Sequence, residues 1–398
     1  MPDTRTLLLT EIFPPAVGGS GRLFWELYSR QQGGSYHIAT AEGPGAAEHD
    51  AAHTPLPIHR LPMLLQDRGI RSIAGMKYYF GSALRVRKLM LQTGCDVLHC
   101  GRNLPEGFVG YLLHKLHGVP YAFYTHGEDI GVSRFSRELA WMTRRVMKHA
   151  VAAIANSYNT RRCLIDDWNY PAERIHVIQP GMDAGRFAVV PRDERVRNDL
   201  GWAGRTVILT VGRLQARKGQ DRLIRALPRV RAAVPNVLYA IVGTGVEEAA
   251  LRALVDAEGL RDCVAFHGGL SDNTVTLAYQ QCDLFALPNR TIGGDIEGFG
   301  MVLLEAQACG KPVVAGASGG TAETMEPGRT GRVVNCDSHE LLADVLLELL
   351  GHPAELAAMG ARARPWVEGQ FDWTQRAAHA AEVFAAIRTA AVRSASRS

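Results

Sequence analysis

Two carboxylates eight residues apart enclose a glycine-rich stretch in the C-terminal half of the chain. Glu297 precedes the stretch, and Glu305 follows it inside an apolar run typical of a helix. If the helix begins near Gly300, the unpaired backbone N–H groups of residues 299–302 can bind a phosphate. The two carboxylates would then flank that anion and accept hydrogen bonds from sugar hydroxyls. The pattern predicts ribose at one end, a diphosphate in the middle and a hexose at the other.

Two cations follow a short apolar strand pattern at residues 207–211. Arg213 and Lys218 lie between this strand and a helical pattern that starts near residue 220. Open α/β sheets bind ligands beyond the C-terminal ends of their strands, so both side chains are placed to bind a diphosphate. Taken one at a time, the two cations are more often ordinary solvated residues, and either glutamate alone is explained as an exposed residue of a helix or a loop.

A glycine pair, Gly18 and Gly19, lies between the first strand pattern and the first helical pattern. Glycines at such a turn let backbone N–H groups approach an anion at the helix N-terminus. The stretch is not a Gly-x-Gly-x-x-Gly fingerprint, because position 24 is Phe24, and it is not a Walker A loop, because no Gly-Lys-Ser/Thr follows. A turn without a ligand is the alternative.

Short apolar runs alternate with amphipathic helical patterns along the whole chain, which predicts parallel βαβ units of the α/β class. One series of runs falls in the first 180 residues and a second between residues 207 and 334. We predict an N-terminal domain over residues 1–185, a linker over 186–204 and a C-terminal domain over 205–374. A C-terminal helix over 375–398 is expected to pack back on the N-terminal domain.

The composition is that of an ordinary globular protein, with 46% hydrophobic and 21% charged residues. A net charge of +4 is too weak to indicate nucleic-acid binding. The seven cysteines lack zinc-ligand spacing and predict reduced, buried thiols. No apolar run approaches the roughly 20 residues of a membrane span, and the N-terminus lacks a signal-peptide pattern, so we expect a cytoplasmic protein.

One basic segment leaves open a peripheral contact with the inner face of a membrane. Residues 68–88 contain six cations and no carboxylate, interleaved with aromatic side chains. This composition is typical of an interfacial amphipathic helix. A solvated helix face is the alternative. The cations are Arg68, Arg71, Lys77, Arg85, Arg87 and Lys88, and the aromatic residues are Tyr78, Tyr79 and Phe80.

Six motifs, in their order along the chain, resemble the family-4 retaining glycosyltransferases of GT-B architecture. They are Gly18-Gly19, Thr125-His126-Gly127, Pro180-Gly181-Met182-Asp183, Val211-Gly212-Arg213 with Lys218, Glu297-x7-Glu305, and Ser318-Gly319-Gly320 with Glu323. Residues 285–323 are also similar to bacterial mannosyltransferases that act on phosphatidylinositol mannosides and to exopolysaccharide glycosyltransferases. The resemblance implies two Rossmann-like domains facing a deep interdomain cleft, the N-terminal one for the acceptor and the C-terminal one for a nucleotide sugar.

The resemblance also implies a reaction. A hexose, mannose ahead of glucose, would pass from a GDP- or UDP-sugar to a hydroxyl of a lipid-linked, glycan or small-molecule acceptor, with retention of configuration. No metal or other cofactor is expected, and the sequence contains no Asp-x-Asp cation signature.

Site residues carry over position by position. The resemblance implies that Arg213 and Lys218 neutralise the diphosphate, that Glu305 binds ribose and that Glu297 binds the donor sugar. It further implies catalytic roles for His126, Arg213, Lys218 and Glu297. The implied donor-binding residues are Gly18, Gly19, Arg213, Lys218, Glu297, Phe299, Gly300, Met301, Val302 and Glu305.

Three other functions compete with this interpretation. An NAD-dependent oxidoreductase is disfavoured because Gly243-Thr244-Gly245 is followed by Val246, Glu247 and Glu248 rather than by the rest of the fingerprint. A GT-B nucleotide-sugar epimerase or phosphorylase would share the cleft without transferring sugar to a new acceptor. A catalytically silent binding subunit would not need the complete set of cleft residues.

Overall fold

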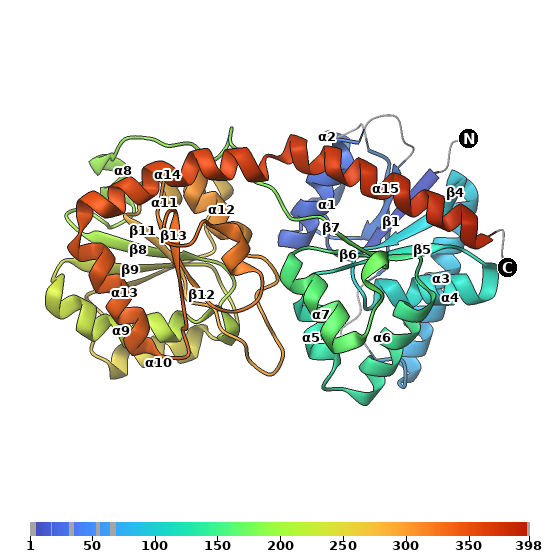
Figure 1. The fold of residues 1–398 in the computed structure, drawn as a ribbon, viewed down its shortest axis with the longest axis horizontal. Helices are drawn as coiled ribbons and strands as arrows, with labels where there is room; N and C mark the ends of the chain where they lie inside the picture. Colours follow the sequence, from blue (N-terminus) through green and yellow to red (C-terminus); the bar gives the residue numbers. More distant parts are fainter. Residues whose placement is uncertain (1–4, 17, 32–35, 53–55, 64–68, 396–398) are drawn as a thin grey trace. The chain divides into compact units, whose positions relative to one another are not determined.

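The computed structural model describes residues 5–16, 18–31, 36–52, 56–63 and 69–395. The chain divides into two compact units, one formed by Met1–Pro180 with Trp373–Ser398 and the other by Gly181–Asp372 (Figure 1). Each unit is built on a parallel β-sheet with helices on both faces, as the alternating pattern predicts.

The first unit contains a seven-stranded parallel sheet in the order β3-β2-β1-β4-β5-β6-β7. The strand order reverses at β1, which pairs with both β2 and β4. Leu7 of β1 lies opposite His37 of β2 and Leu98 of β4. The strands are β1 (Arg5–Thr10), β2 (Tyr36–Ala41), β3 (Ile58–Leu61), β4 (Cys95–Cys100), β5 (Tyr121–Thr125), β6 (Ala152–Ala155) and β7 (Ile175–Val177). The helices are α1 (Gly19–Ser29), α2 (Ala46–Ala52), α3 (Ile73–Thr93), α4 (Glu106–His117), α5 (Glu128–Ser133), α6 (Arg137–His149), α7 (Tyr158–Trp168) and α15 (Trp373–Ala395).

The second unit contains a six-stranded parallel sheet in the order β10-β9-β8-β11-β12-β13. Its strands are β8 (Thr206–Val211), β9 (Val237–Val242), β10 (Val264–Gly268), β11 (Leu284–Leu287), β12 (Val313–Gly316) and β13 (Gly331–Val334). Its helices are α8 (Glu194–Asp199), α9 (Gln220–Ala233), α10 (Glu248–Ala257), α11 (Asp272–Gln281), α12 (Met301–Ala308), α13 (His339–Gly351) and α14 (Pro353–Phe371). Successive β9 side chains join two separate hydrophobic clusters, because strand residues alternate between the faces of the sheet.

Residues 186–204 differ from the predicted linker, because they belong to the second unit and contain α8. Arg197 in this helix is fully buried. Its guanidinium donates to the carbonyl oxygen of Arg205 at 2.6 Å and lies 3.4 Å from the Asp283 carboxylate. The segment is therefore part of the folded second unit rather than a linker, and one of its charged residues is buried with its own partners.

The C-terminal helix α15 packs against α1 of the first unit. Gln31 donates through Nε2 to the carbonyl oxygen of Ala377 at 3.1 Å, and Phe384 stacks on Tyr28 with ring centroids 5.0 Å apart. The first unit is thus completed by the last segment of the chain (Figure 1).

All seven cysteines are unpaired, and all except the half-buried Cys163 are buried, as the sequence predicts. Within the described ranges, no helix has both the length and the apolar character needed to cross a bilayer.

Candidate functional site

The loop after β8 carries both predicted cations of the second unit. It contains a short 3-10 turn, η2 (Ala216–Lys218), and ends at Gly219, where α9 begins. Gly219 has φ +75°, and a Cβ atom there would lie 1.7 Å from the carbonyl oxygen of Pro288. Only glycine fits this position, so the close approach of the loop to the end of β11 depends on it.

The two predicted cations have different environments. Arg213 is exposed, and none of its contacts among the described residues is an ion pair. Lys218 is only 8% exposed, and its Nζ lies 2.5 Å from Oε2 of Glu297. The structure therefore brings together two residues that the sequence analysis assigned to different parts of a ligand.

Arg217 is a third member of this cluster, and the sequence analysis missed it. Its Nη1 lies 2.5 Å from the same Oε2 of Glu297, and its Nε lies 3.0 Å from Oδ1 of Asp295. Arg217 and Glu297 are nearly buried, whereas Asp295 is about one-third exposed. The sequence feature that could have indicated this pairing is the match between two adjacent cations, at 217 and 218, and two nearby carboxylates, at 295 and 297.

Two opposing effects determine the charge of Glu297. Burial alone would raise the pKa of its carboxyl group, but the charges of Lys218 and Arg217 and their hydrogen bonds outweigh burial and lower the pKa below its ordinary value. Glu297 is therefore a carboxylate at neutral pH.

The Ser318-Gly319-Gly320 motif fixes the main chain of Glu297. The N–H of Gly320 donates to the carbonyl oxygen of Glu297 at 2.9 Å. Gly319 has φ +69°, and a Cβ atom there would lie 1.8 Å from the same oxygen. This motif therefore positions Glu297 through the backbone, while Arg217 and Lys218 hold its side chain.

Helix α12 begins at Met301 with Gly300 as its N-cap, as the glycine pattern predicts. Gly300 has φ +95°, which favours glycine. The Phe299 side chain is buried and packs against Phe371, so only its backbone can take part in binding. Met301 and Val302 form the first helical turn and are half-buried.

Glu305 lies further along α12 and has a different partner from Glu297. The hydroxyl of Tyr279, on α11, donates to its Oε2 at 2.8 Å. Tyr279 is fully buried and was not singled out from the sequence. The two glutamates of the motif are therefore held by separate groups.

The predicted glycine pair of the first unit lies at the start of α1. Gly18 is the N-cap, with an extended φ of 175°, and Gly19 is the exposed first helical residue. A Cβ atom on Gly18 would lie 3.0 Å from Cγ2 of Ile12. Val17, within the same predicted loop, is outside the described residues.

His126 follows β5 and is half-buried. Its Nε2 lies 3.0 Å from the carbonyl oxygen of Gly101, and its backbone N–H donates to Oδ1 of Asp129 at 3.0 Å. Because a carbonyl oxygen only accepts, Nε2 carries the proton in this contact and Nδ1 is an acceptor in the neutral ring. The ring is therefore held in one orientation and one tautomer.

A buried charged network occupies the ends of β1 and β4, where the strand order of the first unit reverses. Arg102 Nη2 lies 2.6 Å from Glu11 and 3.1 Å from Glu106, and Glu11 also accepts from the hydroxyl of Tyr78 at 2.6 Å. Burial, with Glu106 nearby, raises the pKa of Glu11. The network attaches α3 near the C-terminal ends of β1 and β4, the end of the sheet at which open α/β proteins bind ligands.

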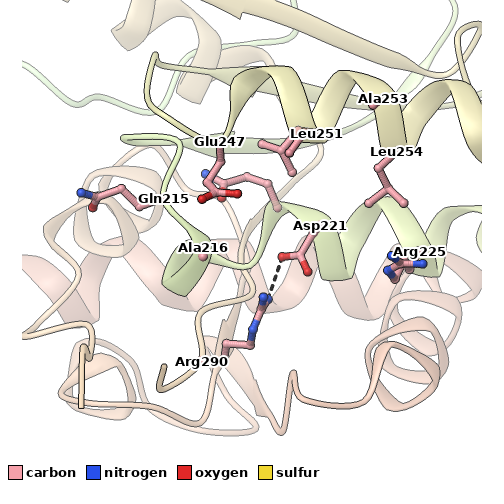
Figure 2. A pocket seen from close by; sticks show the side chains of 11 residues that line it. Gln215, Ala216, Asp221, Arg225, Glu247, Leu251, Ala253, Leu254 and Arg290 are labelled. Atoms are coloured by element: carbon pink, nitrogen blue, oxygen red, sulfur yellow. Dashed lines mark hydrogen bonds and ion pairs between the residues drawn. The ribbon is translucent and has the colours of Figure 1, made fainter. Parts of the chain in front are cut away.

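A pocket of about 420 Å³ lies between the first turns of α9 and α10 (Figure 2). Arg290 crosses it and donates to Asp221 at 2.7 Å, while its backbone N–H donates to the carbonyl oxygen of Arg217 at 2.8 Å. None of the predicted site residues lines the pocket. Arg290 therefore fixes the main chain of η2 from the side of α9.

Two family models together cover most of the chain. Residues 17–186 match the model described as "Glycosyltransferase Family 4", and residues 192–366 match the one described as "Glycosyl transferases group 1".

Full-length relatives share about one-third of their residues with this chain. A GDP-mannose-dependent alpha-(1-6)-phosphatidylinositol monomannoside mannosyltransferase of Mycolicibacterium smegmatis is 32% identical and covers 96% of this chain and 99% of its own. The GDP-mannose-dependent monoacylated counterpart of Corynebacterium glutamicum is 33% identical, over 93% and 94%. A D-inositol 3-phosphate glycosyltransferase of Arthrobacter is 29% identical, over 89% and 83%.

Solved structures with the same fold are more distant in sequence. HepE of Anabaena, in complex with UDP-glucose, superimposes with a TM-score of 0.81 at 22% identity and covers 96% of this chain and 99% of its own. Sucrose-phosphate synthase of Thermosynechococcus elongatus gives a TM-score of 0.79 at 22% identity, over 97% and 100%. At this level of identity the likeness describes the fold alone.

The charge cluster around Glu297 predicts a pH-dependent contribution to stability. A carboxylate whose pKa is lowered by folding stabilises the folded chain above its unfolded pKa, and this contribution is lost as the pH falls through the folded pKa. We expect Glu297→Gln to lower the free energy of unfolding by about 3 kcal/mol at neutral pH, because it removes the carboxylate partner of Lys218 and leaves Arg217 with Asp295 as its carboxylate partner. The difference from wild type should shrink below the ordinary carboxyl pKa of 4.5.

Urea unfolding at a series of pH values measures this difference directly. Glu382→Gln is the matched control, because its side chain is 81% exposed, and it should follow the wild-type curve. A Glu297→Gln difference that stays constant or grows in acid would contradict the lowered pKa.

Proposed function

The chain belongs to the family-4, group 1 glycosyltransferases with a GT-B fold, and from this premise we propose that it transfers mannose from GDP-mannose to a hydroxyl of a lipid-linked acceptor. The chain is a hexosyltransferase whose donor is a nucleotide sugar. The relatives at 32–33% identity support the choice of GDP-mannose, because they are GDP-mannose-dependent enzymes and match this chain over nearly their whole length. The UDP complexes, at 22% identity, do not weigh against it.

The second unit supplies the groups that this donor requires. Arg213, Lys218 and the N-terminus of α12 provide positive charge for the diphosphate, whose negative charge grows as the bond to the sugar breaks. This charge makes a metal ion unnecessary in the proposed reaction. Glu305 is assigned to the ribose and Glu297 to the hexose, and their separate partners support separate roles.

We expect retention of the anomeric configuration. The acceptor hydroxyl attacks C1 of the hexose on the face from which the diphosphate leaves. The bond from C1 to the phosphate oxygen breaks, and that oxygen takes the hydroxyl proton. His126, Gly18 and Gly19 belong to the first unit, and their roles toward the donor remain predictions.

An exposed face of α3 supports an amphiphilic acceptor. Its apolar side chains recur at helical spacing and are 42–70% exposed. Arg71, Lys77 and Lys88 are exposed on the same helix or just before it, whereas Arg68 lies outside the described residues. The exposed apolar residues of α3 that form this face are Ile73, Met76, Phe80, Leu84 and Leu91.

The start of α6 extends this surface. Oε1 of Glu138, on α6, accepts from the backbone N–H groups of Ile70 and Arg71 at 2.7 Å each, which joins the two helix starts. Phe135 and Trp141 are 73% and 44% exposed. Apolar side chains among cations suit the interface of an anionic membrane. A soluble acceptor, as in the inositol phosphate enzyme of Arthrobacter, would not need this face.

Calorimetry with GDP, UDP and ADP, paired with an assay of GDP-mannose turnover, tests the donor assignment. We expect GDP to bind most tightly and GDP-mannose to be consumed faster than UDP-glucose. Tighter binding of UDP together with preferred turnover of UDP-glucose would contradict it.

Two variants test the roles assigned at the site. Glu305→Ala should weaken GDP binding about 10-fold or more, because the half-buried carboxylate that pairs with Tyr279 and is assigned to the ribose is lost. Glu297→Ala should leave GDP affinity within a few-fold and lower turnover, since its place is at the sugar. Equal losses of GDP affinity in both variants would refute the division of roles.

Co-sedimentation with phosphatidylglycerol vesicles tests the membrane face. Replacing Lys77 and Lys88 with Ser should weaken binding at low salt by about 2 kcal/mol, or about 30-fold, at ~1 kcal/mol for each cation. Phe80→Ser with Leu84→Ser should also weaken it, whereas Val246→Ser, at an 88% exposed position of the second unit, is the matched control. Wild-type protein that stays in the supernatant would favour a soluble acceptor.

A further inference from the structure

Two cations share one oxygen of Glu297, and among the residues that the structure describes only Arg217 has a second carboxylate partner. Lys218 and Arg217 both approach Oε2 at 2.5 Å, and Arg217 alone also lies against Asp295, at 3.0 Å. The cluster is neutral, with two carboxylates and two cations. Because Lys218 is already paired with Glu297, a negatively charged ligand that binds Lys218 must compete with this carboxylate for its ammonium group.

We infer that Arg217 is a positioning residue that holds the Glu297 carboxylate in place while Lys218 moves from Glu297 to the diphosphate of the donor. This inference rests on the roles proposed above for Glu297 and Lys218. Arg217 itself touches neither substrate nor reacting atoms in this account.

The chemistry of the two side chains separates their tasks. Lysine places a compact ammonium on a flexible four-carbon stem, so Lys218 can change partners by rotating its own side chain. A guanidinium is planar and has five N–H donors in a fixed fork, so Arg217 can contact two carboxylates at once. Arg217 makes such a double contact, to Asp295 and Glu297.

Glu297 needs a remaining partner once Lys218 has left. It is 8% exposed, and an unpaired carboxylate at such a position would be strongly destabilised. Without Arg217, Lys218 would stay bound to Glu297 or the carboxylate would move toward water. Either outcome would disturb the group assigned to the donor sugar.

The main chain around Arg217 is anchored independently of Lys218. Its carbonyl oxygen accepts from the N–H of Arg290, whose side chain is paired with Asp221 (Figure 2). The backbone of Glu297 is fixed by Gly320. The exchange therefore requires movement of the Lys218 side chain alone, with both ends of the Arg217–Glu297 pair held still.

A double-mutant cycle tests this inference, with Arg217→Met, Glu297→Gln and the double variant assayed for GDP release from GDP-mannose and for GDP binding. We expect Arg217→Met to lower kcat on the order of 10- to 100-fold, as a misplaced substrate contact does, with GDP affinity within a few-fold of wild type. In the Glu297→Gln background the same change should have little further effect, because Arg217 acts through that carboxylate. The acidic limb of the kcat profile should move to higher pH in Arg217→Met.

Two further variants separate positioning from folding. Arg229→Met, on α9 and with a side chain 55% exposed, removes the same charge and should leave kcat unchanged. Arg217→Lys keeps the charge but cannot contact both carboxylates, so we expect a wild-type melting temperature with an intermediate kcat. This variant carries the test if Arg217→Met does not fold.

The inference would be overturned if the loss of kcat in the double variant equalled the product of the losses in the two single variants. A wild-type kcat in both Arg217 variants would also overturn it. A lower melting temperature of Arg217→Met without a shift in the pH profile of kcat would overturn it as well. Wild-type kcat in Glu297→Gln would instead refute the proposed role of Glu297, and with it the need for positioning. Preference for UDP-glucose would refute only the proposed donor, and the same cycle would then be measured with UDP-glucose.

Discussion

The carboxylate of Glu297, buried beside Arg217 and Lys218, is the interaction on which the geometry of the second unit depends. A buried charge of this kind is tolerated only when it is paired, so the segments that carry the three residues must meet with little freedom. Those segments are the loop after β8 and the loop before α12. The neighbouring strands β8 and β11 bring them together, because each loop leaves the same end of the sheet.

The loops around this ion cluster approach one another so closely that two positions require glycine. Gly219 lets the first loop approach the carbonyl of Pro288, and Gly319 lets a third loop approach the carbonyl of Glu297. In both cases a single Cβ atom would separate the segments. The start of α12, which we predict to bind the diphosphate, comes only a few residues after Glu297, so a cluster that fixes Glu297 also restricts where the helix begins. The ion cluster thus restricts the positions of the loops and of the helix start that make up the predicted donor site.

Much of this could be predicted from the sequence because the signals were local. Strand and helix patterns, the glycine before α12 and the order of motifs each span a few residues, and the two parallel sheets and the family followed from them. The pairing of Arg217 with Asp295 and Glu297 joins positions about 80 residues apart, which periodicity does not report. Arg197 shows the same limit: its polar neighbours in the sequence indicate a linker, whereas its partners Arg205 and Asp283, just before β8 and β11, can be identified only in the folded chain.

In the proposed exchange, Lys218 changes its partner when the donor binds, while Arg217 does not. A crystal structure of the complex with GDP tests it most directly, through the distances from Nζ of Lys218 to Glu297 and to the phosphate oxygens. We expect Nζ to leave Oε2 of Glu297 for a phosphate oxygen, while Arg217 keeps its contacts with both Asp295 and Glu297. A complex in which Lys218 remains on Glu297, or in which Arg217 is the residue that turns to the phosphate, would contradict it.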